Sequence, residues 1–446
     1  MDALTIIRKV FTRIALLLGI LVVFTLVINL PWFDEDLHPE IVPLLSPQPV
    51  SMEGNAWPLI YGFTAASERD PEEAGLAIVA QLRERFAAGE PATLASDEMA
   101  NTLGAAPVDQ DWREAWPSYS CNARSELDCA DRLVADAGRA GHVHPRLAVL
   151  LDRYGDIVAA SRFRENEEFD ATTPLPDYAQ LMLVARIRLA LSFRDDSIER
   201  FLELAARDVE FWKLMLRDGQ SLVAKMVALA GLRNDTTFLS MLVRRRQLSP
   251  EQLDAVVRIL TPLSEAERDI GETFLAEMRI ALLSSKDLAV LTEGPSPVVE
   301  LALQEQATLN EYYLNTTIPL RLRASLSAAD FYRQHGYESL SYTVRSFPPP
   351  LYNLGGKLVL RWMASEMNVE NYISRVHDLD GRIALVLLQA EIARQADRPI
   401  EDIVRSSVYR NPYTRDPMDY DRSAGTIGFD CLANESDVCA VRLRSH

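Results

Sequence analysis

An uncharged apolar run near the N-terminus constrains this chain more than any other feature. Residues 14–30 read IALLLGILVVFTLVINL and hold no charged side chain. Trp32 and Phe33 extend the run with aromatic rings, which suit the membrane interface. The whole stretch is long enough to cross a bilayer as a helix. The sequence therefore predicts one transmembrane anchor over residues 14–33, preceded by a short cytoplasmic segment, residues 1–13.

The charges that flank this run predict its orientation. Basic residues precede the run and acidic residues follow it, namely Arg8, Lys9 and Arg13 before, and Asp34, Glu35 and Asp36 after. The basic end stays in the cytoplasm, so the bulk of the chain is expected in the periplasm of a bacterium, anchored in the inner membrane. Large residues at the end of the run disfavour cleavage by signal peptidase. Two alternatives stay open: a helix buried in a soluble core, and cleavage after about residue 50.

Four cysteines fall in two local pairs of equal spacing. Cys121 and Cys129 bracket NARSELD, and Cys431 and Cys439 bracket LANESDV. In an oxidising compartment such spacing favours two short-range disulfides, 121–129 and 431–439. A metal site is the weaker alternative, because neither pair has C-x-x-C spacing and no histidine lies close to either. The cysteines thus support export independently of the apolar run.

Composition excludes some partners and is neutral about others. The chain has 48% hydrophobic residues and a net charge of −18. This hydrophobic content is ordinary for a globular protein with a buried core. The negative charge argues against a nucleic-acid partner, because phosphates would be repelled.

The pattern along the chain predicts a mainly α fold, a helical bundle or irregular stack of helices with a small C-terminal β hairpin. Prolines dominate residues 34–56, which we expect to form an extended stalk. Helical periodicity then runs through an expected periplasmic helical domain, residues 57–290. Residues 291–446 are expected to form a C-terminal helical region that ends in the hairpin. Gly381 lies inside a long helical pattern and weakens the expectation that this helix is continuous.

Two segments carry a resemblance to a known family. NLGGKLVLRWMASEMNVENYISRVHDLDGRIALVLLQAEIARQ, from Asn353, resembles the penultimate stretch of a family of uncharacterised, membrane-anchored proteobacterial proteins. RNPYTRDPMDYDRSAGTIGF, from Arg410, resembles their D-P-[FY]-[ST]-G-x-P-[ML]-x-Y tail, with Asn411 in place of Asp and Arg415 in place of Gly. That tail is also similar to the C-terminal loop of secretion pseudopilins, whose N-terminal Gly-Phe-Glu cleavage site is absent here. The resemblance implies a bacterial source and a terminal hairpin, and no activity.

Few side chains suggest chemistry. His142 and His144 could share one face of a strand as metal ligands, although no third ligand lies nearby. Asp416, Asp419 and Asp421 offer oxygen ligands for calcium, but their spacing is not that of an EF-hand. Solvated surface turns are the favoured interpretation of both sets.

One further group lies within a single predicted helix. Arg375, His377 and Asp380 could form a polar cluster with acid–base chemistry, since residues three apart share a helix face. The alternative is a polar network that only packs helices together. No P-loop, G-x-S-x-G elbow or S-x-x-K motif occurs, and no cofactor is indicated.

These observations favour a non-enzymatic function, although they leave enzymatic activity open. The leading hypothesis is an inner-membrane-anchored periplasmic binding or scaffold protein with an envelope protein partner. A periplasmic cell-wall hydrolase is the alternative, and it requires a cleft with two suitably spaced carboxylates or a metal. A third hypothesis is an accessory factor of pilus or type II secretion machinery, which rests on the tail.

Overall fold

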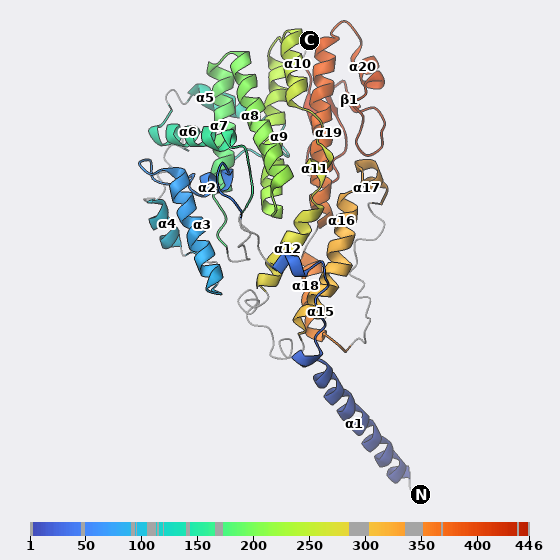
Figure 1. Cartoon of the computed structure of the whole chain (residues 1–446). Coiled ribbons are helices and arrows are strands. Elements are labelled where there is room, and N and C mark those ends of the chain that lie inside the picture. The colour runs from blue at the N-terminus through green and yellow to red at the C-terminus, as the bar shows by residue number, and fades with distance from the viewer. Residues whose placement is uncertain are drawn as a thin grey trace. The chain divides into compact units, whose positions relative to one another are not determined.

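The computed structural model is mainly helical and ends in a small β-sheet, as the sequence predicts (Figure 1). The residues that it describes are 3–45, 50–90, 94, 96–104, 113, 116–118, 120–139, 143–165, 173–284, 303–334, 351–366, 369–434 and 437–444. The chain divides into two compact units, each assembled from separated segments. Unit 1 comprises Met1–Pro47, Met278–Leu320 and Gly336–Asn368, and unit 2 comprises Gln48–Glu277, Arg321–His335 and Val369–His446. Periodicity along the sequence suggests continuous ranges, because contacts between distant segments leave no local pattern.

The N-terminal helix α1 covers Ala3–Ile28. Within it, Lys9–Ile28 has a mean hydropathy of 2.6, and none of this window is buried inside the protein. By length and composition this helix could cross a membrane, and no other helix in the described ranges meets the same criteria. The helix begins well before residue 14, since the basic N-terminal residues also support helix formation.

The other described elements of unit 1 are short, and α15 (Glu305–Tyr312) contacts two of them. The elements are the 3-10 turns η1 (Pro31–Phe33) and η2 (Val42–Leu45), α15, the π-helical turn η5 (Tyr313–Thr317) and α18 (Leu354–Glu366). Two helices contribute residues to both units, α12 (Gly271–Ser284) and α16 (Ile318–Ala324).

The segment after α1 is attached to α15 by hydrogen bonds. The Asp34 carboxylate accepts hydrogen bonds from the backbone amides of Gln306 and Ala307, both at 2.9 Å, and so caps α15. The His38 amide donates to the Asn310 side chain at 2.7 Å. Prolines do prevent an α-helix here, but acidic side chains attach the segment to the positive N-terminal end of α15.

Unit 2 holds most of the helices and the larger core. Its elements are α2 (Ala56–Tyr61), α3 (Pro71–Ala87), α4 (Ser96–Leu103), α5 (Cys129–Arg139), α6 (Pro145–Ala159), α7 (Tyr178–Asp195), α8 (Ile198–Asp218), α9 (Leu222–Arg245), α10 (Pro250–Ile259), α11 (Glu265–Arg268), α17 (Ala328–Gln334), α19 (Val369–Arg394) and α20 (Ile400–Ser406). Helix α9 is central, because α7, α8 and α19 all pack against it. Gly231 of α9 allows α8 to pack closely, because a Cβ at this position would lie 2.3 Å from the buried Trp212 ring of α8.

The C-terminal strands form a three-stranded antiparallel sheet, one strand more than the expected hairpin. The strands β1 (Asp419–Asp421), β2 (Thr426–Gly428) and β3 (Ala440–Arg442) lie in the order β1-β2-β3. Ile427 pairs with Val441 across the sheet, and both side chains are buried. Strands β2 and β3 pack against α19.

Gly381 does not interrupt α19, which is continuous from Val369 to Arg394. It instead makes room for the C-terminal tail. A Cβ at this position would lie 2.5 Å from the Phe429 ring and 2.8 Å from Pro412. The glycine is therefore explained by close packing of the tail on the helix, which is a tertiary requirement.

Candidate functional site

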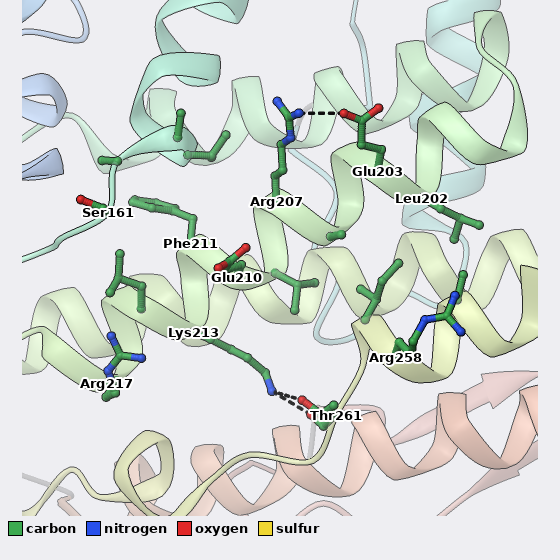
Figure 2. Close-up of a pocket in the computed structure, with 18 of the residues that line it drawn as sticks. Ser161, Leu202, Glu203, Arg207, Glu210, Phe211, Lys213, Arg217, Arg258 and Thr261 are labelled. Atoms are coloured by element: carbon green, nitrogen blue, oxygen red, sulfur yellow. Dashed lines mark hydrogen bonds and ion pairs between the residues drawn. The ribbon is translucent and has the colours of Figure 1, made fainter. Parts of the chain in front are cut away.

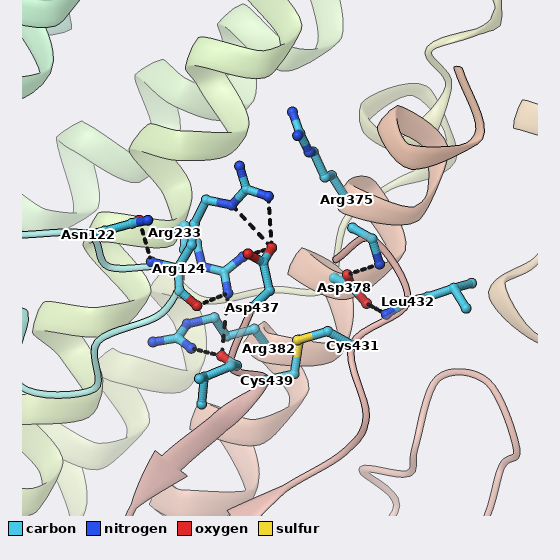
Figure 3. Close-up of polar contacts among 12 residues, drawn as sticks. Asn122, Arg124, Arg233, Arg375, Asp378, Arg382, Cys431, Leu432, Asp437 and Cys439 are labelled. Carbon is cyan, nitrogen blue, oxygen red and sulfur yellow. Dashed lines mark hydrogen bonds and ion pairs between the residues drawn. A yellow bond between two sulfur atoms is a disulfide. The ribbon is translucent and has the colours of Figure 1, made fainter. Parts of the chain in front are cut away.

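Both cysteine pairs form disulfides, and unit 2 brings their loops into direct contact. The bonded pairs are Cys121–Cys129 and Cys431–Cys439, as the spacing predicts. Arg124 of the first loop forms an ion pair with Asp437 of the second at 2.9 Å (Figure 3). The Val438 amide donates to the Arg124 carbonyl at 2.7 Å. We call these two joined loops, residues 121–129 and 431–439, the clasp.

Asp378 of α19 holds the start of the second loop. Its carboxylate accepts hydrogen bonds from the Leu432 and Ala433 amides, both at 3.0 Å, and from the Tyr413 hydroxyl at 2.6 Å. Only 1% of the residue is exposed. Burial raises the pKa of Asp378, while the hydrogen bonds oppose this shift. A carboxylate with three donors around it is a fixed attachment point between the tail and α19.

Arginines surround the clasp on its helical side. Arg233 of α9 donates to the carbonyls of Arg124 and Val438, both at 3.3 Å. Arg382 of α19 donates to the same Val438 carbonyl at 3.1 Å and is buried. Burial, with repulsion from Arg233, lowers the pKa of Arg382 to about 9. The clasp thus concentrates positive charge in a region of low polarity, where each charge needs a counter-charge or hydrogen bonds.

The predicted cluster of Arg375, His377 and Asp380 does not assemble. His377 is buried against the Phe331 ring at 5.3 Å, and burial lowers its pKa to about 4. Asp380 accepts a hydrogen bond from the Leu263 amide at 2.8 Å and lies 3.6 Å from the Arg268 guanidinium. No hydrogen bond or ion pair joins Arg375, His377 and Asp380 to one another in the described part of the chain, and each of the three side chains contacts a different partner.

The metal candidates are dispersed as well. His142 lies outside the described residues, and the His144 ring caps α6 by accepting from the Arg146 amide at 3.2 Å. The Asp421 carboxylate accepts from the Ser423 and Ala424 amides within a turn. Asp416 and Asp419 are exposed and belong to no group of three potential ligands among the described residues.

One group of three potential ligands does occur in the described ranges. The ligand atoms of Asp378, Cys431 and Cys439 lie within 4.8 Å of one another. The two sulfurs are bonded to each other, and a metal would require thiolates. In its disulfide form this group therefore serves the clasp and does not hold a metal.

A separate groove lies on the outer side of α8 and encloses about 1010 Å³ (Figure 2). Its floor is apolar and half-buried, with Ala206 and Leu214 of α8 and Ala255 and Ile259 of α10. Charged side chains stand along the rims: Glu199, Glu203, Arg207, Glu210, Arg217 and Arg258.

The rim charges are only partly neutralised. Arg207 pairs with Glu203 at 2.7 Å, and this contact is drawn in Figure 2. Glu210 of α8 and Arg258 of α10 are exposed, and neither has an ion-pair partner within the part of the chain that the structure describes. The groove therefore offers half-buried apolar side chains beside one negative and one positive rim charge that have no ion-pair partner among the described residues.

The glutamates of the groove bear on hydrolytic chemistry. Hydrogen bonds from Arg200 lower the pKa of Glu203, and a backbone hydrogen bond with one from Gln252 lowers the pKa of Glu199. A glycosidase needs a carboxyl group whose pKa is raised, so that it can donate a proton near neutral pH. The pKa values of Glu199 and Glu203 are instead lowered.

The sequence patterns gave no role to the residues that define the clasp, namely Asp378, Arg124, Arg233 and Asp437. One signal was present: each cysteine loop contains one of the two partners, Arg124 and Asp437, of opposite charge. Only the fold shows that loops more than 300 residues apart meet, as the contact between residues separated by 313 positions demonstrates.

Comparisons with known proteins returned nothing. No protein-family model, curated protein or solved structure matches this chain. The resemblance of the segments from Asn353 and Arg410 to membrane-anchored proteobacterial proteins thus stays a prediction.

Proposed function

We propose that this chain is a periplasmic binding or scaffold protein, held in a bacterial inner membrane by α1, with its N-terminus in the cytoplasm. The groove between α8 and α10 is the proposed binding surface for an envelope protein partner. The observation that carries the proposal is the apolar floor of this groove, flanked by the unpaired charges of Glu210 and Arg258.

The partner that fits is an amphipathic helix. Such a helix places its apolar stripe on a groove of this kind and presents charges at the edges of the stripe. Its edges should carry a basic residue for Glu210 and an acidic residue for Arg258, because both rim charges are otherwise unsatisfied. Exposed apolar floors with polar rims are typical of protein interfaces.

The hydrolase alternative receives less support. Its cleft would need a carboxyl group that stays protonated near neutral pH, and the pKa values of Glu199 and Glu203 are shifted downward. The two disulfides agree with an oxidising compartment and therefore with export.

Photo-crosslinking in living cells tests the binding surface. A photoreactive residue replaces Ala206 on the groove floor, and a control chain carries it at the exposed Asp402 of α20. We expect a discrete crosslinked partner from position 206 alone, and loss of that product when Arg258→Glu is added. Arg405→Glu, an exposed charge reversal on α20, should leave the product unchanged.

Two results would overturn the proposal. Equal crosslinking from positions 206 and 402, insensitive to Arg258→Glu, would mean that the groove binds no specific partner. Cleavage of murein by the purified full chain would show an enzyme instead. Separately, a periplasm-dependent reporter at the C-terminus tests the orientation, and activity only in the cytoplasm would exclude it.

A further inference from the structure

Two aspartates in the core of unit 2 lie on neighbouring helices. Asp208 of α8 is fully buried, and Asp235 of α9 is 1% exposed. Only residues 219–221 separate α8 from α9, so the two helices pack as antiparallel neighbours (Figure 1). Aspartates are rare at this depth unless a partner offsets their charge.

The contact between Gly231 and Trp212 sets the register of the two helices. A Cβ at Gly231 would lie 2.3 Å from the Trp212 ring, so these positions are opposite each other. Asp208 lies one turn before Trp212 on α8, and Asp235 lies one turn after Gly231 on α9. Because the helices are antiparallel, both turns lead in the same direction along the pair. The two aspartates therefore face each other one turn away from the glycine.

A single arginine is available for the two carboxyl groups. The Arg188 Nη1 atom of α7 lies 2.6 Å from Asp208 Oδ1, and the guanidinium lies 5.3 Å from the centre of the Tyr154 ring of α6. The Oδ2 atoms of Asp208 and Asp235 are both buried and have no hydrogen-bond partner among the described residues. Two ionised aspartates would thus leave one negative charge and two acceptor atoms unsatisfied in the core.

Other charges on the surrounding elements contact groups of their own. Asp136 of α5 contacts Arg139, Arg153 of α6 the Phe63 carbonyl, Arg186 of α7 the Cys121 carbonyl, Glu267 of α11 Lys213, and Arg382 of α19 the Thr237 hydroxyl. The charges of α10 and β3 are exposed. Burial raises the pKa of Asp208 to about 7, although Arg188 opposes this shift. Burial and repulsion from Asp208 also raise the pKa of Asp235.

We propose that Asp208 and Asp235 form a binding site for one proton, which they share in the folded chain. Asp208 stays ionised beside Arg188, and the proton on Asp235 completes a hydrogen bond between the two carboxyl groups. This arrangement makes the cluster neutral and gives both buried Oδ2 atoms a partner. The proton therefore joins α8 to α9, and it is bound on folding and released on unfolding.

The site makes the stability of unit 2 depend on pH. An unfolded aspartate releases its proton near the ordinary pKa of 3.8, whereas the folded pair keeps one proton at higher pH. Stability from this proton is complete below about pH 4 and falls as pH rises through the raised pKa. Neither aspartate lines the groove on α8, so the inference does not depend on the proposed partner helix.

Infrared spectroscopy of the full chain in a non-ionic detergent detects the proton directly, because protonated and ionised carboxyl groups absorb at different frequencies. At pH 7 we expect one carboxylic acid band in the unmodified chain that is absent from Asp235→Asn. Asp208→Asn should lose the same band, since the remaining aspartate then ionises beside Arg188. A band that survives in either single variant and disappears only in the double variant would overturn the shared proton.

Urea unfolding between pH 5 and 7, followed by tryptophan fluorescence, measures the consequence. One shared proton should raise the unfolding equilibrium constant by up to about tenfold per pH unit, and Asp235→Asn should lose this contribution. The matched control is Asp136→Asn, which removes another buried carboxylate that contacts its own arginine, Arg139. It should keep the acid band and the pH response. Equal pH responses in the unmodified chain and Asp235→Asn would contradict the proposal.

A further measurement needs no variant and therefore holds if a substitution prevents folding. Carbon-13 labelling of the aspartate carboxyl carbons in the unmodified chain moves the acid band and so identifies it as aspartate. We expect a labelled acid band at pH 7 in the folded chain and its loss in urea at the same pH. The absence of any labelled acid band in the folded chain would show that both aspartates are ionised and would overturn the proposal.

Discussion

The clasp in unit 2 and the contacts at the C-terminal end of α1 in unit 1 both join distant segments of the chain, but they use different kinds of side chains. We call the contacts among Asn29, Gln304 and Asn353 at the end of α1 the base. Each ties segments that lie hundreds of residues apart. The clasp uses charges: Asp437 forms an ion pair with Arg124, the Asp378 carboxylate accepts from the Leu432 amide, and each loop contains a disulfide. The base uses neutral amides: the Asn353 amide donates to the Asn29 side chain at 2.8 Å, and the Gln304 amide donates to the Asn353 side chain at 3.0 Å.

This difference shows where charged side chains can be used to join distant segments. At the base, the connected segment continues into the apolar helix α1, and neutral amides avoid the cost of removing charges from water there. In the clasp, the Arg124 side chain is 32% exposed, so water can offset its charge.

Asp378→Ala should produce the largest effect on this comparison. The change leaves two backbone amides and the Tyr413 hydroxyl without their acceptor, and we expect a loss of about 3 kcal/mol in unit 2. Native-state hydrogen exchange of the amides in residues 437–444 of the full chain measures it. Asp254→Ala, which removes an exposed carboxylate paired with Arg394, is the control and should change little. An equal response to both changes would mean that Asp378 does not hold the tail.

Asn353→Gly should weaken the base by about 2 kcal/mol. Asn353 has a left-handed backbone with φ of 52°, which glycine also adopts easily, so the loss reports the side chain alone. Its Oδ1 accepts from the Gln304 and Gly356 amides. Protease sensitivity after residue 351 is the measurement. Asn353→Asp keeps these acceptor positions and should recover part of the protection, and failure to do so would contradict this account.

In the C-terminal tail, a substitution by glycine at a similar backbone conformation should have the opposite effect and increase stability. Arg415 has φ of 67°, a region that disfavours residues with a Cβ. Arg415→Gly should therefore stabilise the tail by about 1 kcal/mol. The change in denaturant midpoint of unit 2 tests this expectation. A decrease in stability would mean that the Arg415 side chain makes an important contact.

The smallest effect concerns pH and comes from Asp378 of α19. Burial raises the pKa of Asp378 above the ordinary value of 3.8, so the folded chain binds its proton more tightly than the unfolded chain does. The stability contributed by this group should fall as pH rises from about 4 through the raised pKa. Asp378→Asn cannot titrate. The stability difference between the unmodified chain and Asp378→Asn should therefore shift against the unmodified chain over that window, and a shift in the other direction would contradict the burial argument.

Particular residues show how far the sequence could be read. The apolar composition of residues 14–30 predicted a helix able to cross a membrane, because hydrophobicity and length act locally. Serine caps at Ser249 and Ser264 marked helix starts for the same reason, and both form capping boxes. Gly381 was misleading, since its role depends on the Phe429 and Pro412 side chains that pack on it. Arg375, His377 and Asp380 appeared to be a group in sequence and face different neighbours in space.

The sequence by itself determined the apolar N-terminal helix, the mainly helical fold and both disulfide pairs, because each depends on residues close together along the chain. Only the tertiary structure decided that the two cysteine loops meet, that Asp378 holds the tail, and that arginines from α9 and α19 both donate to the Val438 carbonyl. Those contacts join residues hundreds of positions apart, and their energies depend on burial, distance and charge that no local pattern records.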